Sequence, residues 1–225
     1  DKTILSSRFF EKFYKEQKIL IYENYVYKCD DFQIQLNESY YNLTNKNKKI
    51  IAFIGVVRYK DILINLINAF KNNNNFIIRI YGDGPSINDL IKFCKNNNIS
   101  NIDFYGRFEY KNLKYIYSDV DFVWAAYPNK SKNVKYAISN KFYETMYYNK
   151  IGIFSCNTEL GEFVKDNKIG IVVDPYDLKS IQENIVKCDN IQKIIMNISK
   201  YRSQNNIFWE ENEMRLIDFI TSRNN

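Results

Sequence analysis

The chain has 225 residues, of which 45% are hydrophobic, and 32 Lys and Arg stand against 26 Asp and Glu, a formal net charge of +6. This apolar fraction is enough for one full-sized globular domain with a smaller appended piece, and it excludes an intrinsically disordered chain. No apolar stretch reaches the ~20 residues that a helix needs to cross a bilayer. Even Ile50 to Val57 lies directly between Lys49 and Arg58.

The chain contains no histidine, and its four cysteines stand far apart at positions 29, 94, 156 and 188. Nothing in this spacing indicates a metal site, so we expect reduced thiols in a cytoplasmic protein without a metal or other cofactor. The chain begins at Asp1 without a basic-then-apolar leader. We therefore expect a fragment of a longer protein and no signal peptide.

The basic excess is compatible with an anionic partner such as nucleic acid, a phosphate-bearing small molecule or an acidic membrane face. Lys, Asn, Ile, Tyr and Phe are abundant together, and their A/T-rich codons explain much of the excess without any partner. The lysines and the 19 tyrosines are spread along the whole chain rather than clustered on one element. We therefore expect no nucleic-acid binding.

The first 48 residues differ from the rest of the chain. Residues 1–27 predict only a short strand, a helix around Phe9 to Glu16 and a second strand at Ile19 to Tyr22, which is too little for a domain. Residues 28–48 are polar and rich in Asn and Lys, a composition typical of a linker.

From Lys49 onward, short apolar runs alternate with segments of helical period. The first run, Ile50 to Ile54, predicts a strand, and Asp61 to Lys71 predicts the helix that follows it. The alternation continues through predicted strands at 76–81, 102–105, 120–124, 151–154 and 170–173 and predicted helices at 86–97, 110–117, 139–148 and 159–165. A helical tail follows from Ile191. This order predicts an α/β fold with a doubly wound, Rossmann-like parallel sheet.

Ligands of such sheets bind beyond the carboxyl ends of the strands, where free N–H groups at helix N-termini favour anions. The turn after the first strand places Gly55 beside two cations, Arg58 and Lys60. Gly55 has no side chain, so a ligand can approach its backbone closely, and the Arg58 guanidinium can donate two parallel hydrogen bonds to one phosphate. Both features suit a diphosphate ligand. A solvated basic turn is the plainer interpretation of the same residues.

A second turn predicts a helix N-terminus capped by Ser139 or Asn140, with Lys141 and Glu144 on one face at i, i+3. The Glu144 carboxylate can accept hydrogen bonds from ribose hydroxyls, worth about 1.5 to 3 kcal/mol each when shielded from water. The alternative is an ordinary surface pair between Lys141 and Glu144, worth ~0.3 to 0.5 kcal/mol.

A third turn, Gly82-Asp83-Gly84-Pro85, follows a predicted strand, and its two glycines need serve only the turn. By itself it falls well short of a dinucleotide-binding fingerprint. No glycine-rich loop ends in Gly-Lys-Ser or Gly-Lys-Thr, which excludes P-loop ATPases and GTPases.

These turns belong to one ordered series of segments. The series is Phe53-Ile54-Gly55 with Arg58 and Lys60, Ile80-Tyr81-Gly82-Asp83-Gly84-Pro85, Ile102-Asp103-Phe104-Tyr105-Gly106, Ile116-Tyr117-Ser118-Asp119-Val120-Asp121, Asn140-Lys141-Phe142-Tyr143-Glu144, Glu159-Leu160 with Glu162-Phe163-Val164, Ile169-Gly170-Ile171 and Phe208-Trp209-Glu210. In order and spacing it resembles the C-terminal domain of retaining glycosyltransferases with the GT-B fold, in particular family 4 ("group 1"), of the bacterial capsule and surface-polysaccharide type. The resemblance covers most of the chain.

The resemblance implies that a metal-independent hexosyltransferase moves a sugar from a UDP- or GDP-linked donor to a glycan or lipid-linked acceptor with retention. The implied donor-binding residues are Gly55, Arg58, Lys60, Arg107, Phe108, Asn140, Lys141 and Glu144, of which Arg58, Lys60 and Glu144 are the implied catalytic residues. The two cations of the first turn would contact the diphosphate, Glu144 the ribose, and the backbone near Arg107 and Phe108 the base. Asn140 and Lys141 would shape the turn beside the sugar and phosphates.

The chain departs from the family pattern in two places. The first of the family's paired glutamates, separated by seven residues, falls on Tyr136, and Ile151 stands where many relatives have proline. The missing glutamate bears on how the sugar hydroxyls are held and gives slight support to a non-catalytic GT-B scaffold module. A sugar-nucleotide epimerase or a phosphorylase is a further alternative, but the histidines or pyridoxal lysine of those enzymes are not recognisable.

The resemblance also implies a domain division. Residues 1–48 would be a remnant of the preceding acceptor-binding domain plus a linker, with Asn24 near the hinge. Residues 49–205 would bind the nucleotide sugar, and residues 206–225 would form a helix crossing back toward the acceptor domain. We therefore expect the isolated chain to bind donor weakly and to be nearly inactive. The expected location is the cytoplasm, and peripheral association with the inner face of the membrane is compatible with it.

Overall fold

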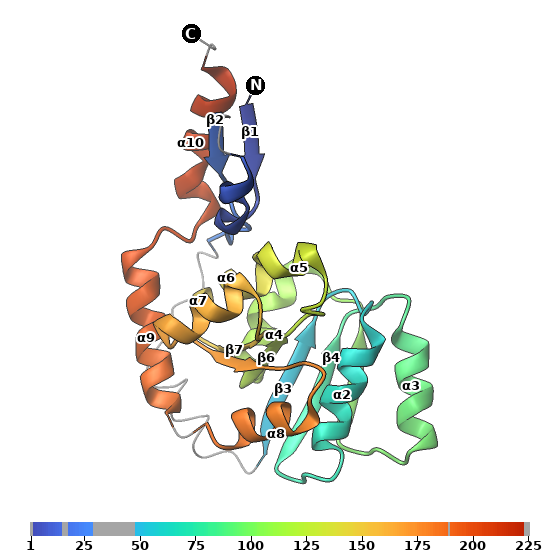
Figure 1. Cartoon of the computed structure of the whole chain (residues 1–225). Coiled ribbons are helices and arrows are strands. Elements are labelled where there is room, and N and C mark those ends of the chain that lie inside the picture. The colour runs from blue at the N-terminus through green and yellow to red at the C-terminus, as the bar shows by residue number, and fades with distance from the viewer. Residues whose placement is uncertain (1, 15–17, 29–47, 189, 223–225) are drawn as a thin grey trace.

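The computed structural model describes residues 2–14, 18–28, 48–188 and 190–222. Within them the chain forms a six-stranded parallel sheet wrapped by helices and a separate two-stranded parallel sheet (Figure 1). The strands of the larger sheet are β3 (Lys49–Ile54), β4 (Phe76–Tyr81), β5 (Ile102–Gly106), β6 (Phe122–Ala125), β7 (Ile151–Ser155) and β8 (Ile171–Val173). The predicted linker at 28–48 lies outside the described residues except at its two ends.

The six strands lie in the order β5-β4-β3-β6-β7-β8, and every neighbouring pair is parallel. The chain first winds outward from β3 to β5 and then returns to the other side of β3 to continue from β6 to β8. The order therefore reverses between β3 and β6, which is the topological switch point of a doubly wound sheet. The predicted Rossmann-like fold class is confirmed.

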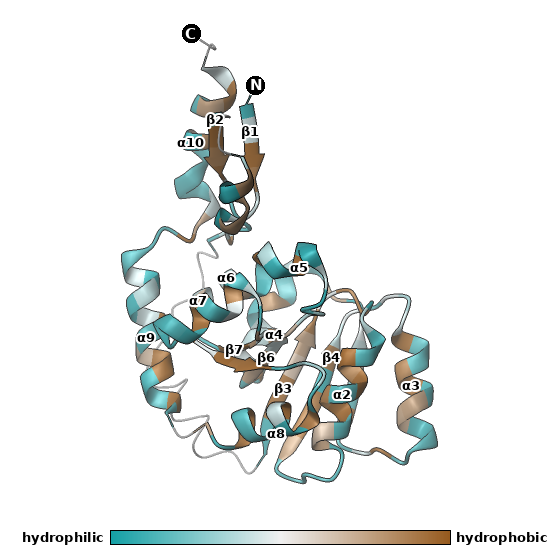
Figure 2. Cartoon of the chain, viewed as in Figure 1, coloured by the Kyte–Doolittle hydropathy of each residue, from teal (hydrophilic) through white to brown (hydrophobic). Residues whose placement is uncertain are grey.

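Helices cover both faces of this sheet. They are α2 (Lys60–Phe70), α3 (Ile87–Asn96), α4 (Leu113–Asp119) after the 3₁₀ turn η2 (Tyr110–Asn112), α5 (Lys132–Tyr136), α6 (Asn140–Tyr147), α7 (Glu159–Asn167), α8 (Leu178–Val186) and α9 (Ile191–Gln204). Helix α2 packs against α3 and α8, while α6 packs against α9. Figure 2 shows hydrophobic residues filling the central strands and only one side of helices such as α3. Burial on both faces explains why β3, β6 and β7 are nearly continuous apolar runs in the sequence.

The structure confirms every predicted strand of this sheet and the helices between them, with ends displaced by at most three residues. Two helices, α5 and α8, were not predicted. Helix α8 did carry a signal, because Leu178, Ile181 and Ile185 recur at helical spacing and the last two are buried. Helix α5 has only five residues and none is buried, so no apolar period identifies it.

The described chain ends form a second layer of structure, which we call the terminal unit. It comprises β1 (Lys2–Leu5), η1 (Arg8–Phe13), β2 (Lys18–Ile21) and α10 (Trp209–Thr221). The predicted helix at 9–16 is a 3₁₀ helix that ends at Phe13, and residues 15–17 lie outside the described part. Figure 1 shows α10 beside the two strands, and Lys2 Nζ donates to the Phe219 carbonyl at 2.6 Å.

An ion pair between Arg8 and Glu23, both in the N-terminal segment, connects the terminal unit to the rest of the fold, the sheet body from β3 to α9, through hydrogen bonds with Tyr143 of α6. The Glu23 side chain is fully buried, and the Arg8 Nη2 lies 2.5 Å from its Oε2. The Tyr143 hydroxyl on α6 donates to the same carboxylate oxygen. The Glu23 hydrogen bond, followed by its charge, raises the pKa of Arg8.

None of the helices in the described residues is long and apolar enough for a membrane span.

Candidate functional site

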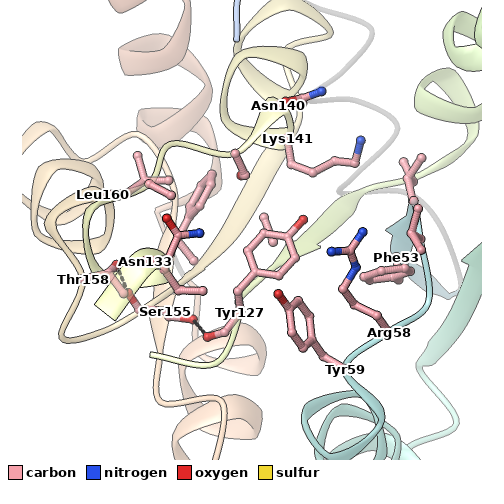
Figure 3. A pocket seen from close by; sticks show the side chains of 18 residues that line it. Phe53, Arg58, Tyr59, Tyr127, Asn133, Asn140, Lys141, Ser155, Thr158 and Leu160 are labelled. Carbon is pink, nitrogen blue, oxygen red and sulfur yellow. Dashed lines mark hydrogen bonds between the residues drawn. The ribbon is translucent and has the colours of Figure 1, made fainter. Parts of the chain in front are cut away.

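A cavity of about 420 Å³ opens at the carboxyl ends of β3, β6 and β7, beside the switch point (Figure 3). We call it the switch-point cavity. Its lining is Phe53, Ile54, Gly55, Val56, Arg58, Tyr59, Ala125, Tyr127, Asn133, Val134, Ala137, Ser139, Asn140, Lys141, Phe154, Ser155, Thr158 and Leu160. Its position is where open α/β sheets bind their ligands.

The switch-point cavity is lined by cations and neutral polar groups. Arg58 and Lys141 contribute positive charge from opposite sides, and the lining contains no Asp or Glu among the described residues. Figure 3 shows the Arg58 side chain and the rings of Tyr59 and Tyr127 projecting into the same space. An anion placed there meets Arg58 and the Lys141 amine, with which Glu144 pairs from beneath the wall, and no carboxylate of the described lining, so the site favours negatively charged ligands.

The N-terminus of α6 adds unpaired donors to this cavity. Ser139 is the N-cap residue, as predicted, but its side chain makes no cap hydrogen bond. Within the described residues its hydroxyl is buried and has no hydrogen-bond partner. The first N–H groups of a helix lack intrahelical acceptors and carry the positive end of its dipole. This corner is therefore suited to bind a phosphate or another anionic group.

Glu144 lies one turn further along α6 and is held by two donors. Its Oε2 accepts hydrogen bonds from Lys141 Nζ at 2.6 Å and from the Tyr117 hydroxyl at 2.5 Å. The Lys141 and Glu144 side chains are only 11% and 6% exposed, so the alternative of an ordinary surface pair is wrong. Glu144 is absent from the lining of both cavities described here. It therefore lies just beneath the cavity wall that Lys141 forms.

Two tyrosines of the switch-point cavity were not predicted. Tyr127 follows the carboxyl end of β6, and Tyr59 lies edge-on to it with ring centroids 5.9 Å apart. Burial, followed by the nearby Glu144 charge, raises the pKa of Tyr127, which keeps the phenol neutral and able to donate. Extending the strand-end rule from β3 to β6 and β7 would have found Tyr127, Ser155 and Thr158.

A second cavity of about 700 Å³, the turn cavity, shares Gly55 and Val56 with the first. Its remaining lining is Gly82, Asp83, Gly84, Pro85, Arg107 and Phe108. Arg107 Nε donates to Asp83 Oδ2 at 2.9 Å, although the Arg107 side chain is 87% exposed. The Gly84 N–H, and then Arg107, lower the pKa of Asp83.

The glycines of the third turn have a role beyond turning. Gly82 has a φ of +135°, and a Cβ there would lie 1.8 Å from the Gly55 carbonyl oxygen. A Cβ on Gly84 would lie 2.5 Å from the Val57 carbonyl oxygen. The two backbones are joined by a hydrogen bond from the Val57 N–H to the Asp83 carbonyl at 3.0 Å. The expectation that these glycines need serve only the turn is therefore wrong.

The sequence-predicted site residues divide into three groups in space. Arg58, Asn140 and Lys141 line the switch-point cavity, Arg107 and Phe108 line the turn cavity, and Gly55 lines both. Lys60 and Glu144 line neither. Lys60 Nζ instead lies 3.1 Å from Asp89 Oδ2 on α3, in an exposed pair. The described residues contain no cluster of three or more His, Cys, Asp or Glu arranged for a metal ion.

The sequence model of the family "Glycosyl transferases group 1" matches residues 37–204. No curated protein sequence matches the chain. Among solved structures, WaaG, a glycosyltransferase involved in lipopolysaccharide biosynthesis, is 12% identical with a TM-score of 0.72, covering 98% of this chain and 62% of WaaG. Anabaena Alr3699/HepE in complex with UDP-glucose is 12% identical with a TM-score of 0.74, covering 98% and 63%.

A third solved structure is a C-terminal domain alone. It belongs to the group 1 glycosyl transferase family protein LpcC from Francisella tularensis, with 16% identity, a TM-score of 0.58, and 80% of this chain and 94% of that one covered. The chain thus spans less than two thirds of the first two structures and nearly all of the third. These likenesses confirm the predicted fold, the Rossmann-like C-terminal half of the GT-B architecture.

Proposed function

Because the chain belongs to the glycosyl transferases of group 1, we propose that it holds the nucleotide-sugar site of a retaining, metal-independent glycosyltransferase. The observation that carries the proposal is the switch-point cavity, where Arg58, Lys141 and the N-terminus of α6 converge and the described lining contains no carboxylate, Glu144 pairing with Lys141 from beneath the wall. A diphosphate leaving group develops negative charge as the sugar departs. Preorganised cations and N–H groups stabilise such charge without a metal.

The two cavities suggest how the donor lies. The diphosphate and sugar would occupy the switch-point cavity, and the base would occupy the turn cavity beside Phe108, because both cavities meet at Gly55 and Val56. Gly55 has no side chain to block the passage, and a Cβ there would meet nothing within 4 Å. Its φ of +143° nonetheless favours glycine.

The proposed role of Glu144 is to bind the ribose. Both of its described hydrogen bonds go to Oε2, from Lys141 and Tyr117. The described residues give no hydrogen bond to Oε1, which is left to accept from a ribose hydroxyl. In this arrangement the same carboxylate holds the Lys141 amine at the cavity wall.

Lys60 would reach the diphosphate only by breaking its ion pair with Asp89.

The wider role is proposed from the relatives. WaaG acts in lipopolysaccharide biosynthesis, and the Anabaena protein was solved with UDP-glucose bound. We extend these to a hexosyl transfer from a UDP- or GDP-linked donor to a glycan or lipid-linked acceptor in bacterial surface-polysaccharide synthesis. With this role we propose a cytoplasmic location and association with the inner face of the membrane.

Calorimetric titration of the chain with UDP and with GDP tests the proposal. One nucleotide should bind, and Arg58→Ala should weaken its binding about 10- to 100-fold because a charge-assisted hydrogen bond is lost. Glu144→Ala should also weaken binding. Arg215→Ala on α10, which bonds Asn212 and lines neither cavity, is the matched control and should change nothing.

Unchanged binding of both nucleotides in Arg58→Ala would contradict the donor site. A second candidate is the non-catalytic scaffold module, favoured by Tyr136 in place of the first family glutamate. It predicts that a folded chain, and the full-length protein with its acceptor domain, bind neither nucleotide.

A further inference from the structure

A third cavity lies between the terminal unit and α5. Its volume is about 390 Å³, and we call it the aromatic cavity. It is lined by four aromatic residues, one lysine and one amide, namely Phe10, Phe13, Tyr14, Tyr136, Lys132 and Asn133.

The two walls of the aromatic cavity are fixed to each other. The Ser7 hydroxyl, whose residue is fully buried, donates to the Tyr136 carbonyl at 2.6 Å. The Phe13 ring meets the Tyr136 ring edge-on with centroids 4.9 Å apart. These contacts join η1 to α5, so the cavity is formed before any ligand arrives and binding costs little ordering.

Aromatic surface remains exposed in the aromatic cavity. Phe13 is 50% exposed and Tyr14 is 36% exposed. Lysine amines lie near rings of the cavity: Lys132 Nζ is 6.0 Å from the Phe13 centroid, and Lys12 Nζ, which also pairs with Glu159, is 4.5 Å from the Tyr136 centroid. The site therefore combines flat apolar faces with hydrogen-bond donors. A matching ligand has apolar faces and a polar rim.

Helix α5 is the partition between this cavity and the switch-point cavity. Lys132 and Tyr136, four residues apart, line the aromatic cavity, whereas Val134 and Ala137, three apart, line the switch-point cavity. Helical spacing places each pair on one face. Asn133 lines both cavities, so ligands in the two would meet across its amide.

Tyr136 lies on the side of this partition that lines the aromatic cavity. In the family pattern this position holds the first glutamate, whereas here its ring belongs to the aromatic cavity and is absent from the switch-point lining. Its backbone is held by Ser7 of the terminal unit. The residue at this position thus forms part of the aromatic cavity and not of the proposed donor site.

We propose that the aromatic cavity binds a pyranose ring of the acceptor glycan. The inference rests on the proposed function and names where its acceptor lies. The C–H faces of a pyranose are apolar and would stack on Phe13 and Tyr14, while its hydroxyls would accept from Lys132 and bond Asn133. A nucleobase would also stack, but the base already has the turn cavity. A lipid phosphate would use the lysines without needing the ring faces.

Saturation-transfer NMR of the 225-residue chain tests this with three probes: methyl α-D-glucopyranoside, methyl α-D-galactopyranoside and methyl N-acetyl-α-D-glucosaminide. At least one should receive saturation on its ring protons. Phe13→Ala should reduce that signal about three- to tenfold, the size expected for a lost aromatic contact. Phe13→Tyr should retain it. The control Tyr115→Ala removes a 64% exposed ring that lines none of the three cavities and should leave it unchanged.

Absence of saturation for all three glycosides overturns the proposal, and so does an equal signal in Phe13→Ala and the unaltered chain. Binding of dioleoylphosphatidylglycerol vesicles that is lost in Phe13→Ala, with no glycoside signal, overturns it in favour of a lipid headgroup. UDP and GDP titrations on the same samples separate the two proposals. Retained nucleotide binding without glycoside binding removes only the aromatic-cavity assignment. Glycoside binding without nucleotide binding removes the donor site, and with it the acceptor role of the pyranose, but leaves the aromatic cavity as a sugar site.

Discussion

The sheet body and the terminal unit are stabilised in different ways. In the sheet body, helices cover both faces of the six strands, and β6 and β7 are buried at every residue. In the terminal unit, two short parallel strands and α10 leave large apolar side chains exposed, including Ile4 at 46%, Met214 at 64% and Ile220 at 59%. The first region is held by apolar burial, whereas the second buries few apolar side chains and contacts the first through ring pairs such as Phe9–Phe163 and through the Glu23–Tyr143 hydrogen bond.

This difference shows which part of the structure maintains each candidate site. The switch-point and turn cavities belong to the sheet body alone, so apolar packing and backbone contacts maintain the donor site. The aromatic cavity spans both regions and depends on how the terminal unit sits on α5 and α6. Arg8, Glu23 and Tyr143 set that position through one buried network. Changes in the two regions should therefore have separable effects.

The largest effect is expected from Gly82→Ala in the sheet body. Its Cβ would lie 1.8 Å from the Gly55 carbonyl oxygen, so the two turns must move apart. We expect a loss of about 3 to 5 kcal/mol in the free energy of unfolding, measured in urea, together with loss of nucleotide binding. Gly106→Ala is the control, with a φ of +71° but nothing within 4 Å of a Cβ. It should cost about 1 to 2 kcal/mol, and equal losses would remove the close-approach explanation.

A smaller and more local effect is expected from Glu23→Gln, which leaves Arg8 without its buried partner. The cost should be about 2 to 4 kcal/mol, because Arg8 remains partly exposed. Hydrogen exchange should accelerate in residues 2–14, 18–28 and 209–222 while β3, β6 and β7 keep their protection. Glu159→Gln breaks the exposed Lys12–Glu159 pair between the same two regions and should cost under about 1 kcal/mol. Acceleration in β6 would show that the regions are not separable.

The smallest effect concerns pH. Burial, and then the Glu23 charge, raise the pKa of Tyr143. The folded state therefore keeps this proton when the unfolded tyrosine, with a pKa of about 10, would lose it. The resulting stability is complete below pH ~10 and is lost as pH rises above it. Tyr143→Phe should flatten this loss at the cost of about 1 kcal/mol at neutral pH. Unfolding free energies between pH 8 and 11 test this, and an unchanged slope in Tyr143→Phe would contradict it.

Much of the fold followed from local pattern. The residues of the apolar runs at 50–54 and 151–154 are all buried, and burial on both faces leaves a continuous apolar signal in the sequence, whereas the run at 76–81 is interrupted by the partly buried Arg79. Helix α5 left no such signal, since none of its five residues is buried. The helix nevertheless forms the partition between two cavities. The apolar pattern of the sequence therefore could not predict a short, unburied helix such as α5.

The candidate site was predicted in part. Gly55 and Arg58 follow directly from the strand-end rule, and the structure places both in the switch-point cavity. Tyr127 was accessible to the same rule but was overlooked. The burial of Glu144 beneath Lys141 was not accessible, because the i, i+3 spacing is the same for an exposed pair and a buried one.

The sequence by itself determined the alternation of strands and helices, the carboxyl-end turns and the family resemblance. Each of these depends on residues that are close together in the chain. Only the tertiary structure decided that Gly82 lies against Gly55, that Glu23 pairs with Arg8 beneath Tyr143, and that Tyr136 faces the aromatic cavity. These contacts join residues far apart in the chain. Their geometry depends on how packed elements exclude water and approach one another, which no local spacing records.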